Sequence, residues 1–264
     1  MFRALAFFGL IIAWEAANAQ SFTKRAFASP GPIAWVEEKN TLYLVERKEG
    51  LLLLLRPHDL FPVTRVREKA LRKANSLAFA NDLLWVGTPE GMLSYRLNAL
   101  PTPGGEKKFK EGVCALAGQG TRLYLQRCRD RQITLFYPGW LGFPLGQGKI
   151  GFIQALAADN DGVWVAQKGQ ILRFLTGDKN PAYILRGPKA SPLTYPVALA
   201  VTPGRIVAAD ARRQDIRIYG KDGRLLGHIP FSMPEKEIWL SASKEGFWVS
   251  VKGEVAYFSW PMAK

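Results

Sequence analysis

The feature that most constrains this chain is a repeat of about forty residues. Six times, an aromatic or β-branched residue stands at the centre of a short apolar stretch, as in Thr41–Val45 (TLYLV) and Leu83–Gly87 (LLWVG). Successive centres are 42, 39, 40, 43 and 41 residues apart. Such even spacing indicates one structural unit repeated six times. The six central residues, called marker residues below, are Tyr43, Trp85, Tyr124, Trp164, Val207 and Trp248.

Each marker residue has the same surroundings. Eight residues before it stands an apolar residue of another short stretch, and turn formers such as Asn81-Asp82 or Pro203-Gly204 separate the two. A third stretch with period-two alternation follows, for example Ile216 to Ile218, and a weaker fourth stretch fills the remainder. Three or four antiparallel strands per repeat are typical of propeller blades. The preceding apolar residues are Trp35, Leu77, Leu116, Leu156, Leu199 and Leu240.

The chain is therefore predicted to be all-β, a six-bladed β-propeller. A β-sandwich with regular turns is the alternative. Two leftover segments favour the propeller. The last repeat ends with Val255–Trp260 and has no fourth strand, while Ser21–Ala28 precedes the first repeat and has no blade of its own. We expect this N-terminal segment to complete the last blade, which closes the ring and removes an exposed sheet edge.

The N-terminus is expected to be an export signal. Arg3 carries a positive charge, Ala4–Trp14 is apolar, and Ala17-Asn18-Ala19 supplies the small residues that signal peptidase requires. An apolar run of that length is too short to span a bilayer, and no second candidate span follows. We therefore expect residues 1–19 to be a signal peptide and residues 20–264 to form one domain. The mature protein is predicted to be exported, periplasmic or extracellular, and not membrane-spanning.

The two cysteines are predicted to form a disulfide. Cys114 precedes the first strand of the third repeat and Cys128 follows its second strand, so a hairpin that turns near Gly120 brings them together. A disulfide also suits an exported protein, because the medium outside the cytoplasm is oxidising. The spacing of fourteen residues matches no zinc, thioredoxin-like or covalent haem motif.

Several segments resemble known propeller families. Pro196–Gly223, with Ile206-Val207-Ala208-Ala209-Asp210, resembles an NHL repeat, and Leu77–Tyr95 resembles the propeller repeat of two-component sensor ectodomains. Pro30–Trp35, followed by Thr41–Leu44, resembles the opening of the gluconolactonase (senescence-marker-protein) family. These resemblances imply the propeller fold, and the last one implies a divalent cation on the axis. Short motifs of this kind are shared by propellers of unrelated function.

The cation ligands of the gluconolactonase family are missing from this chain. That family uses a Glu in its opening motif, an Asn before one inner strand and an Asp before a later one. The corresponding residues here are Pro30, Gln154 and Val197. A hard cation needs several oxygen ligands, mostly carboxylates, so we expect neither the metal nor the lactonase reaction.

No other catalytic constellation is found. The only histidines, His58 and His228, are predicted to lie far from the axis, which argues against a histidine-dependent triad or base. Asp159-Asn160-Asp161-Gly162 resembles a calcium loop, but Gln170 stands where the loop needs a Glu, so a tight turn is the better interpretation. No phosphate-binding loop occurs, and no cofactor is expected.

Charge is the remaining signal. The formal net charge is +14 and the isoelectric point is about 9.9. Loops expected at one end of the propeller hold 18 Lys or Arg against 12 Asp or Glu, while the turns at the other end are net acidic. Excess positive charge favours an anionic partner. The predicted binding residues are Arg47, Lys48, Arg72, Lys73, Arg127, Arg129, Arg131, Lys168, Arg212 and Arg213.

Two functions from different classes fit these observations. The first is a non-catalytic binding or scaffold module that contacts a protein or an anionic polymer of the cell envelope through the basic end. The second is a hydrolase or lactonase with a rearranged axial site. Charge alone would allow nucleic acid as a partner, but no RNA or DNA recognition motif occurs. A monomer is expected.

Overall fold

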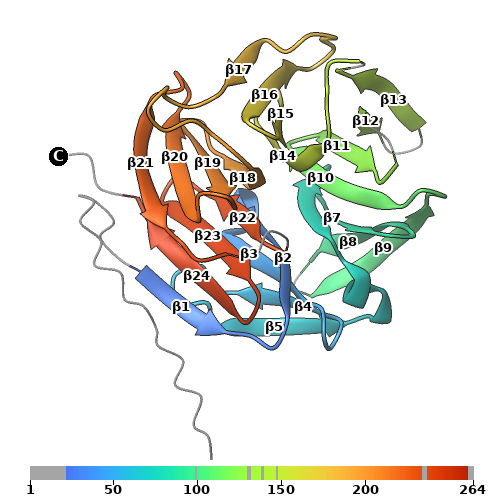
Figure 1. Ribbon diagram of the computed structural model, residues 1–264. Coiled ribbons are helices and arrows are strands. Elements are labelled where there is room, and N and C mark those ends of the chain that lie inside the picture. The colour runs from blue at the N-terminus through green and yellow to red at the C-terminus, as the bar shows by residue number, and fades with distance from the viewer. Residues whose placement is uncertain are drawn as a thin grey trace, which may run out of the picture.

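Six four-stranded antiparallel sheets surround a central axis and form a six-bladed β-propeller (Figure 1). The computed structural model describes residues 22–260, except for residues 99, 130–131, 138–139, 147 and 234–236. Within these residues, helical structure is confined to two short 3-10 helices, η1 (Glu37–Lys39) and η2 (Lys69–Lys73). No helix in the described part of the chain is long and apolar enough to cross a membrane. The predicted fold class is confirmed.

Every blade is a meander whose first strand lies next to the axis. Blade 1 holds β2 (Pro30–Val36), β3 (Thr41–Glu46), β4 (Leu51–Leu55) and β5 (Pro62–Arg67), and blade 2 holds β6 (Ser76–Ala80), β7 (Leu83–Thr88), β8 (Gly91–Leu97) and β9 (Pro101–Lys108). Blade 3 holds β10 (Val113–Gln119), β11 (Arg122–Arg127), β12 (Ile133–Tyr137) and β13 (Trp140–Leu145), and blade 4 holds β14 (Ile153–Ala158), β15 (Gly162–Gln167), β16 (Gln170–Leu175) and β17 (Tyr183–Leu185). Blade 5 holds β18 (Pro196–Val201), β19 (Arg205–Asp210), β20 (Asp215–Gly220) and β21 (Leu225–Pro230). Blade 6 holds β22 (Trp239–Ala242), β23 (Gly246–Val251) and β24 (Glu254–Ser259).

The N-terminal strand closes the ring as predicted. β1 (Phe22–Ala26) is the outer strand of blade 6 and pairs antiparallel with β24, from Phe22 opposite Phe258 to Ala26 opposite Glu254. Figure 1 shows this junction, with the blue N-terminal strand beside the red C-terminal one. Chain segments at opposite ends of the sequence therefore share one sheet, and its outer edge is covered.

The marker residues lie in the second strand of each blade and fill the layers between blades. All six are buried, with exposed fractions between 0% and 7%. Trp164 of blade 4, for example, packs with Leu199, Ile206 and Tyr219 of blade 5. Trp248 of blade 6 stacks on Trp35 of blade 1 at 5.0 Å between ring centroids. The repeat period is therefore the distance along the chain between the side chains that fill successive layers between blades.

Blade 1 departs from the predicted alignment. The marker Tyr43 pairs with Ala34, and the residue equivalent to Leu77 of blade 2 is Ile33 rather than Trp35. The reason is a longer turn, because η1 and Asn40 separate the first two strands of blade 1 whereas Asn81-Asp82 suffice in blade 2. Counting eight residues back from Tyr43 therefore reaches a position two residues too far along the strand.

The topology defines two ends of the propeller. The interblade end carries the connections between blades and the loops between second and third strands. The turn end carries the turns between first and second strands and between third and fourth strands. All the binding residues predicted above, so far as the structure describes them, lie at the interblade end.

Candidate binding surfaces

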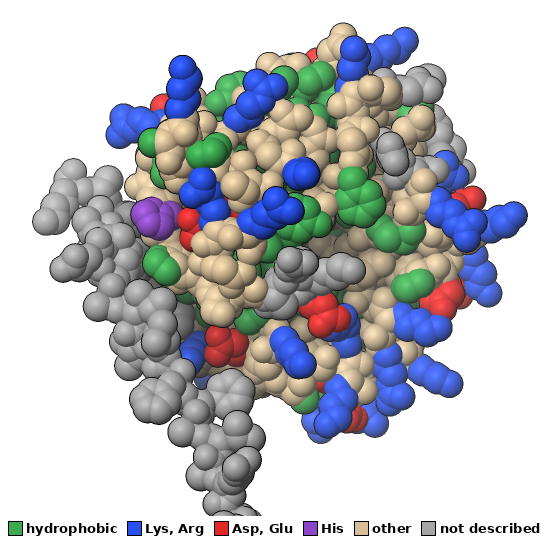
Figure 2. Space-filling model, viewed as in Figure 1, with side chains coloured by type: hydrophobic (Ala, Val, Ile, Leu, Met, Phe, Trp, Pro, Cys, Tyr) green, Lys and Arg blue, Asp and Glu red, His purple; other side chains and the backbone are tan. Residues whose placement is uncertain are grey.

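The predicted basic residues lie on five separate loops of blades 1, 3, 4 and 5 and of the connection between blades 1 and 2, rather than at one point. Arg47 and Lys48 follow β3, Arg72 and Lys73 end η2, and Arg127 ends β11. The remaining ones are in the loops after β11, β15 and β19: Arg129, Lys168, Arg212 and Arg213. Arg131 lies outside the described residues. The face in Figure 2 shows Lys and Arg side chains spread widely, most densely along its right and lower edges.

Acidic side chains neutralise much of this charge in blades 1 and 2. Arg47 pairs with Glu237 at 3.0 Å and lies over the ring of Trp239. Lys73 pairs with Glu90 at 2.5 Å. The nearby Arg67, at the end of β5, pairs with Glu49 at 3.3 Å. Cations that already have acidic partners attract a further anion less strongly, which leaves Lys48 and Arg72 as the predicted binding residues of this side without an ion pair to a described acidic residue.

Blades 3 to 5 hold cations without such partners. We define the basic sector by the loop cations of these blades that form no ion pair with a described acidic residue. No Asp or Glu occurs in residues 131–158 or 179–209, which leaves long parts of these blades without acids. The members of the basic sector are Arg129, Lys149, Lys168, Lys189, Arg212 and Arg213, and all of them are exposed.

A buried polar network holds the blade 5 part of the basic sector in place. The loop between β17 and β18 is ten residues long, and the carboxylate of the fully buried Asp210 accepts hydrogen bonds from its Thr194 and Tyr195 backbone. Arg217, only 2% exposed, donates to the Ser191 carbonyl at 2.6 Å. The Arg213 guanidinium donates to the Pro192 carbonyl at 2.8 Å. These bonds order the loop that carries Lys189.

An exposed aromatic ring stands beside the basic sector. Phe152 is 70% exposed, the largest exposed fraction among the bulky apolar residues described. Its neighbour Gly151 donates its backbone N–H to Gln167 Oε1 at 2.8 Å, which places Phe152 close to the loop of Lys168. A ring beside exposed cations offers an apolar contact to a partner that binds those cations. Sequence patterns did not reveal it because Phe152 lies between strands, outside the repeat.

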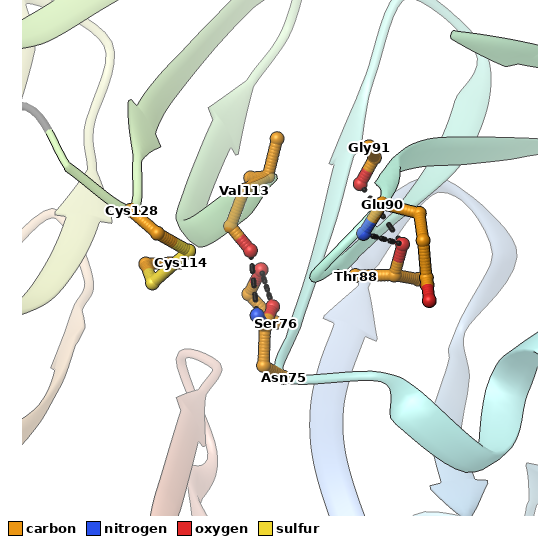
Figure 3. Close-up of a disulfide and its surroundings, with 8 residues drawn as sticks. All are labelled: Asn75, Ser76, Thr88, Glu90, Gly91, Val113, Cys114 and Cys128. Atoms are coloured by element: carbon orange, nitrogen blue, oxygen red, sulfur yellow. Dashed lines mark hydrogen bonds between the residues drawn. A yellow bond between two sulfur atoms is a disulfide. The ribbon is translucent and has the colours of Figure 1, made fainter. Parts of the chain in front are cut away.

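The predicted disulfide is present at the same end. Cys114 and Cys128 are bonded, with their Cα atoms 4.7 Å apart. Cys114 is the extra residue of a β-bulge between Val113 and Ala115, and both half-cystines are exposed. In Figure 3 the disulfide lies near the hydrogen bond in which Asn75 Nδ2 donates to the Val113 carbonyl, a contact between blades 2 and 3. A disulfide is consistent with an oxidising, exported environment.

The three residues that align with the cation ligands of the gluconolactonase family lie at the interblade end of the axis. Pro30 begins β2, and Gln154 and Val197 are bulge residues at the starts of β14 and β18. None of the three carries a carboxylate. Among the described residues, no three His, Cys, Asp or Glu side chains gather closely enough to hold a metal ion. Trp239 Nε1 donates to the Asn75 carbonyl at 2.9 Å and links blade 6 to blade 2 at this end.

A cavity of about 390 Å³ occupies the axis and opens at the turn end. We call it the axial cavity. Its wall consists of the inner strands, each of which contributes an aliphatic residue followed by a small one, as in Leu77-Ala78 and Leu156-Ala157. The wall carries one hydroxyl at this level, Ser241, whose Oγ accepts the Trp35 backbone N–H at 2.8 Å.

Charged groups of blades 6 and 1 form one side of the cavity rim. Glu37, Glu38 and Lys244 all line it. Glu37 accepts a hydrogen bond from Trp35 Nε1 at 2.6 Å and pairs with Lys244 at 3.8 Å. Glu38 is exposed and forms no ion pair with a described cation. The rim therefore has one more carboxylate than ammonium groups.

The aspartate-rich turn at this end is structural, as predicted. Asp159 Oδ1 accepts the backbone N–H groups of Asp161 and Gly162, each at 3.1 Å, which is a tight turn. Asp159 Oδ2 also accepts hydrogen bonds from Lys221 and Trp164, both at 2.8 Å. Burial opposes ionisation of Asp159, but these hydrogen bonds outweigh it and hold its pKa at about 2. The cluster joins blade 4 to blade 5.

The two histidines lie away from the axis. His58 is in the loop after β4 and its Nε2 is 3.6 Å from Glu245, and His228 is in the outer strand β21. Neither lines the axial cavity.

Comparison with known proteins defines the chain as a six-bladed β-propeller and no more narrowly. No protein-family model matches the sequence, and a search of curated proteins finds no match. Among solved structures, the virginiamycin B lyase of Staphylococcus aureus is 12% identical to this chain. The match covers 90% of this chain and 99% of the lyase, with a TM-score of 0.59. The glutaminyl cyclase of Myxococcus xanthus is 13% identical, with coverage of 73% and 92% and a TM-score of 0.54. Hsv2 of Kluyveromyces lactis is 12% identical, with coverage of 84% and 78% and a TM-score of 0.54.

At such low identity these similarities establish the fold alone. They support the propeller that the motifs predict, but they do not support membership of the NHL or gluconolactonase families. Two of the three neighbours are enzymes by name, so the fold itself does not separate catalysis from binding.

Proposed function

We propose that the mature chain is a non-catalytic binding module of the cell envelope and that its basic sector contacts an anionic polymer. One observation carries this proposal: six exposed cations on the interblade loops of blades 3 to 5 form no ion pair with a described acidic residue, whereas Arg47, Arg67 and Lys73 of blade 1 and its connection to blade 2 are paired with glutamates. Fixed cations without local acids attract a polyanion and release its counterions on binding.

Phe152 supports the same assignment. A polymer that neutralises Lys149 and Lys168 would pass the exposed ring, and burying the ring would add an apolar contact to the electrostatic one. The hydrolase or lactonase alternative has less support, because the carboxylates that line the axial cavity, Glu37 and Glu38, are confined to its rim and the side chains of the inner strands are mainly aliphatic.

The test is the salt dependence of polyanion binding. Heparin is the probe, and its affinity for the mature chain is measured by fluorescence anisotropy between 50 and 200 mM NaCl. With five contacts, the logarithm of affinity should fall against the logarithm of salt with a slope of about −4. A variant with Arg129, Lys149, Lys168, Arg212 and Arg213 replaced by serine should lose most of this slope. It should melt as the parent does, since loop charges contribute little stability.

The control removes the same charge from the other end. Serine replaces five exposed turn-end cations, which are Lys39, Arg56, Lys179, Arg224 and Lys244. This variant should keep at least half of the parent's slope. Equal losses in the two variants would mean diffuse attraction and would refute the basic sector as a site. If the parent binds neither heparin nor an anionic wall polysaccharide, an anionic polymer is refuted as the partner. Capture of an acidic protein instead would show that the partner is a protein.

A further inference from the structure

The axial cavity is a second site, independent of the basic sector and at the opposite end of the molecule. We propose that it binds a small amphiphile with an aliphatic chain and a cationic head, such as a primary alkylamine. The chain would lie against the inner strands and the head would remain at the rim beside Glu37 and Glu38. The axial position and the volume of the cavity, the aliphatic side chains that line it and its rim charge carry this inference.

The size of the cavity fits a small ligand. At about 390 Å³, it falls within the range of about 300–1,000 Å³ that is usual for small-molecule sites. The structure contains no segment that fills it among the described residues. A propeller can close its axis with bulky side chains, but here the six inner strands contribute small residues at the level of Ala78 and Ala157.

The wall selects an apolar ligand. Ile33 and its five leucine equivalents, of which Leu77 and Leu240 are two, form the deep part. Half-buried residues, including Trp35, Phe79 and Val201, form the wider part towards the rim. Each inner strand is the edge of its sheet, so the N–H and C=O groups on its axis side have no partner strand, and one of them, the Trp35 N–H, donates to Ser241 Oγ. The aliphatic side chains between these backbone groups are the surface that an aliphatic chain would cover.

The rim selects the charge of the head group. Glu38 has no described cationic partner, and the carboxylate of Glu37 is only 3.8 Å from the single rim ammonium, Lys244. An ammonium head would satisfy Glu38 and could lie over the half-buried ring of Trp35, which cations favour. A carboxylate head would face the rim's excess negative charge. Charge complementarity therefore favours an amine over an acid of equal chain length.

The test uses three probes of one chain length: octylamine, 1-octanol and octanoate. Isothermal calorimetry on the mature chain should rank them with octylamine tightest and octanoate weakest. Shorter amines should bind about fourfold more weakly per methylene removed, since each buried methylene contributes about 0.8 kcal/mol. Equal affinities for octylamine and octanoate would overturn the cationic head, and no binding of any probe would overturn the site.

Two kinds of variant locate the ligand. Ala158→Phe and Ala242→Phe introduce a ring at half-exposed wall positions and should each weaken octylamine at least tenfold, with the melting temperature confirming that the variant folds. Glu38→Gln should weaken octylamine several-fold and leave octanol unchanged. Asp178→Asn is the matched control, an exposed carboxylate at the same end but outside the cavity. Unchanged octylamine binding in both phenylalanine variants would place the ligand elsewhere and refute the proposal. Heparin binding should not change in any of these variants.

Discussion

Removing the disulfide should lower the stability of the protein by an amount that the chain-entropy model predicts directly. The perturbation is the double replacement Cys114→Ser, Cys128→Ser. The two half-cystines are fourteen residues apart and both are exposed. Replacing them with serine therefore opens no cavity and buries no polar group. Loss of the covalent constraint on the unfolded chain remains as the main effect.

The magnitude follows from the size of the loop. A closed loop of about fifteen residues stabilises the folded state by about 3 kcal/mol in the chain-entropy model. For a domain of this size, 1 kcal/mol changes the melting temperature by roughly 2–4 °C, so the double variant should melt about 6–12 °C lower. The contact between Asn75 and Val113 that borders the disulfide should persist, because it does not involve the sulfur atoms.

The assay is thermal and urea unfolding followed by circular dichroism, with and without reductant. Reductant should shift the parent protein to the melting temperature of the double variant and leave the double variant unchanged. Intact-mass measurement without reductant should show the parent to be lighter than its reduced form by the mass of two hydrogen atoms. A difference below about 1 kcal/mol would refute the entropic account. Two free thiols in exported protein would refute the disulfide itself.

Three further predictions concern the fold. A chain that begins at Ser29 lacks β1 and its five paired positions, so it should lose roughly 3–5 kcal/mol of stability or aggregate. Equal urea midpoints for this chain and for one that begins at Gln20 would contradict the ring closure. Asp159→Asn should lower the free energy of unfolding by about 2 kcal/mol at pH 7. Because the pKa of Asp159 in the folded protein is lowered to about 2, the parent should lose this extra stability as the pH falls from about 4 towards 2. If the stability of the variant fell in parallel with that of the parent over this pH range, the lowered pKa would not be the cause. Gly118→Ala places Cβ 2.2 Å from a backbone carbonyl of blade 2 and should cost about 1–3 kcal/mol in urea unfolding, whereas Gly204→Ala, with open space around Cβ, should change stability little.

The period of the sequence was sufficient to predict the architecture because the interfaces between blades repeat. Every layer between neighbouring blades needs one bulky side chain from the second strand, so Trp85, Tyr124 and Trp164 recur at nearly equal distances. Ring closure could be inferred from a blade with a strand missing and a segment without a blade. The alignment failed only in blade 1, where the turn is two residues longer and a fixed offset from Tyr43 no longer applies.

The candidate sites were harder to predict because they do not follow the period. Formal charge counts Arg47 and Arg129 equally, yet the first has Glu237 within 3.0 Å and the second has no described acidic partner. Glu237 is far from Arg47 in the sequence, so only the folded ring brings the two together. The exposure of Phe152 depends in the same way on the Gly151–Gln167 hydrogen bond. The absence of acids in residues 131–158 was visible in the sequence and is the signal that could have narrowed the surface.

The two ends of this propeller are separated by its own packing. Six inner strands converge on one axis, and their crowding restricts that region to small and aliphatic residues such as Ala78 and Leu240. The charged side chains near the axis therefore lie on the loops and turns at the two ends of the propeller. At the interblade end, Trp239 and its bond to Asn75 link blade 6 to blade 2, while the wide cavity opens at the turn end. A polyanion on the basic sector and an amphiphile in the axial cavity would thus occupy the protein together. Binding of one should leave the affinity for the other unchanged unless the blades themselves move.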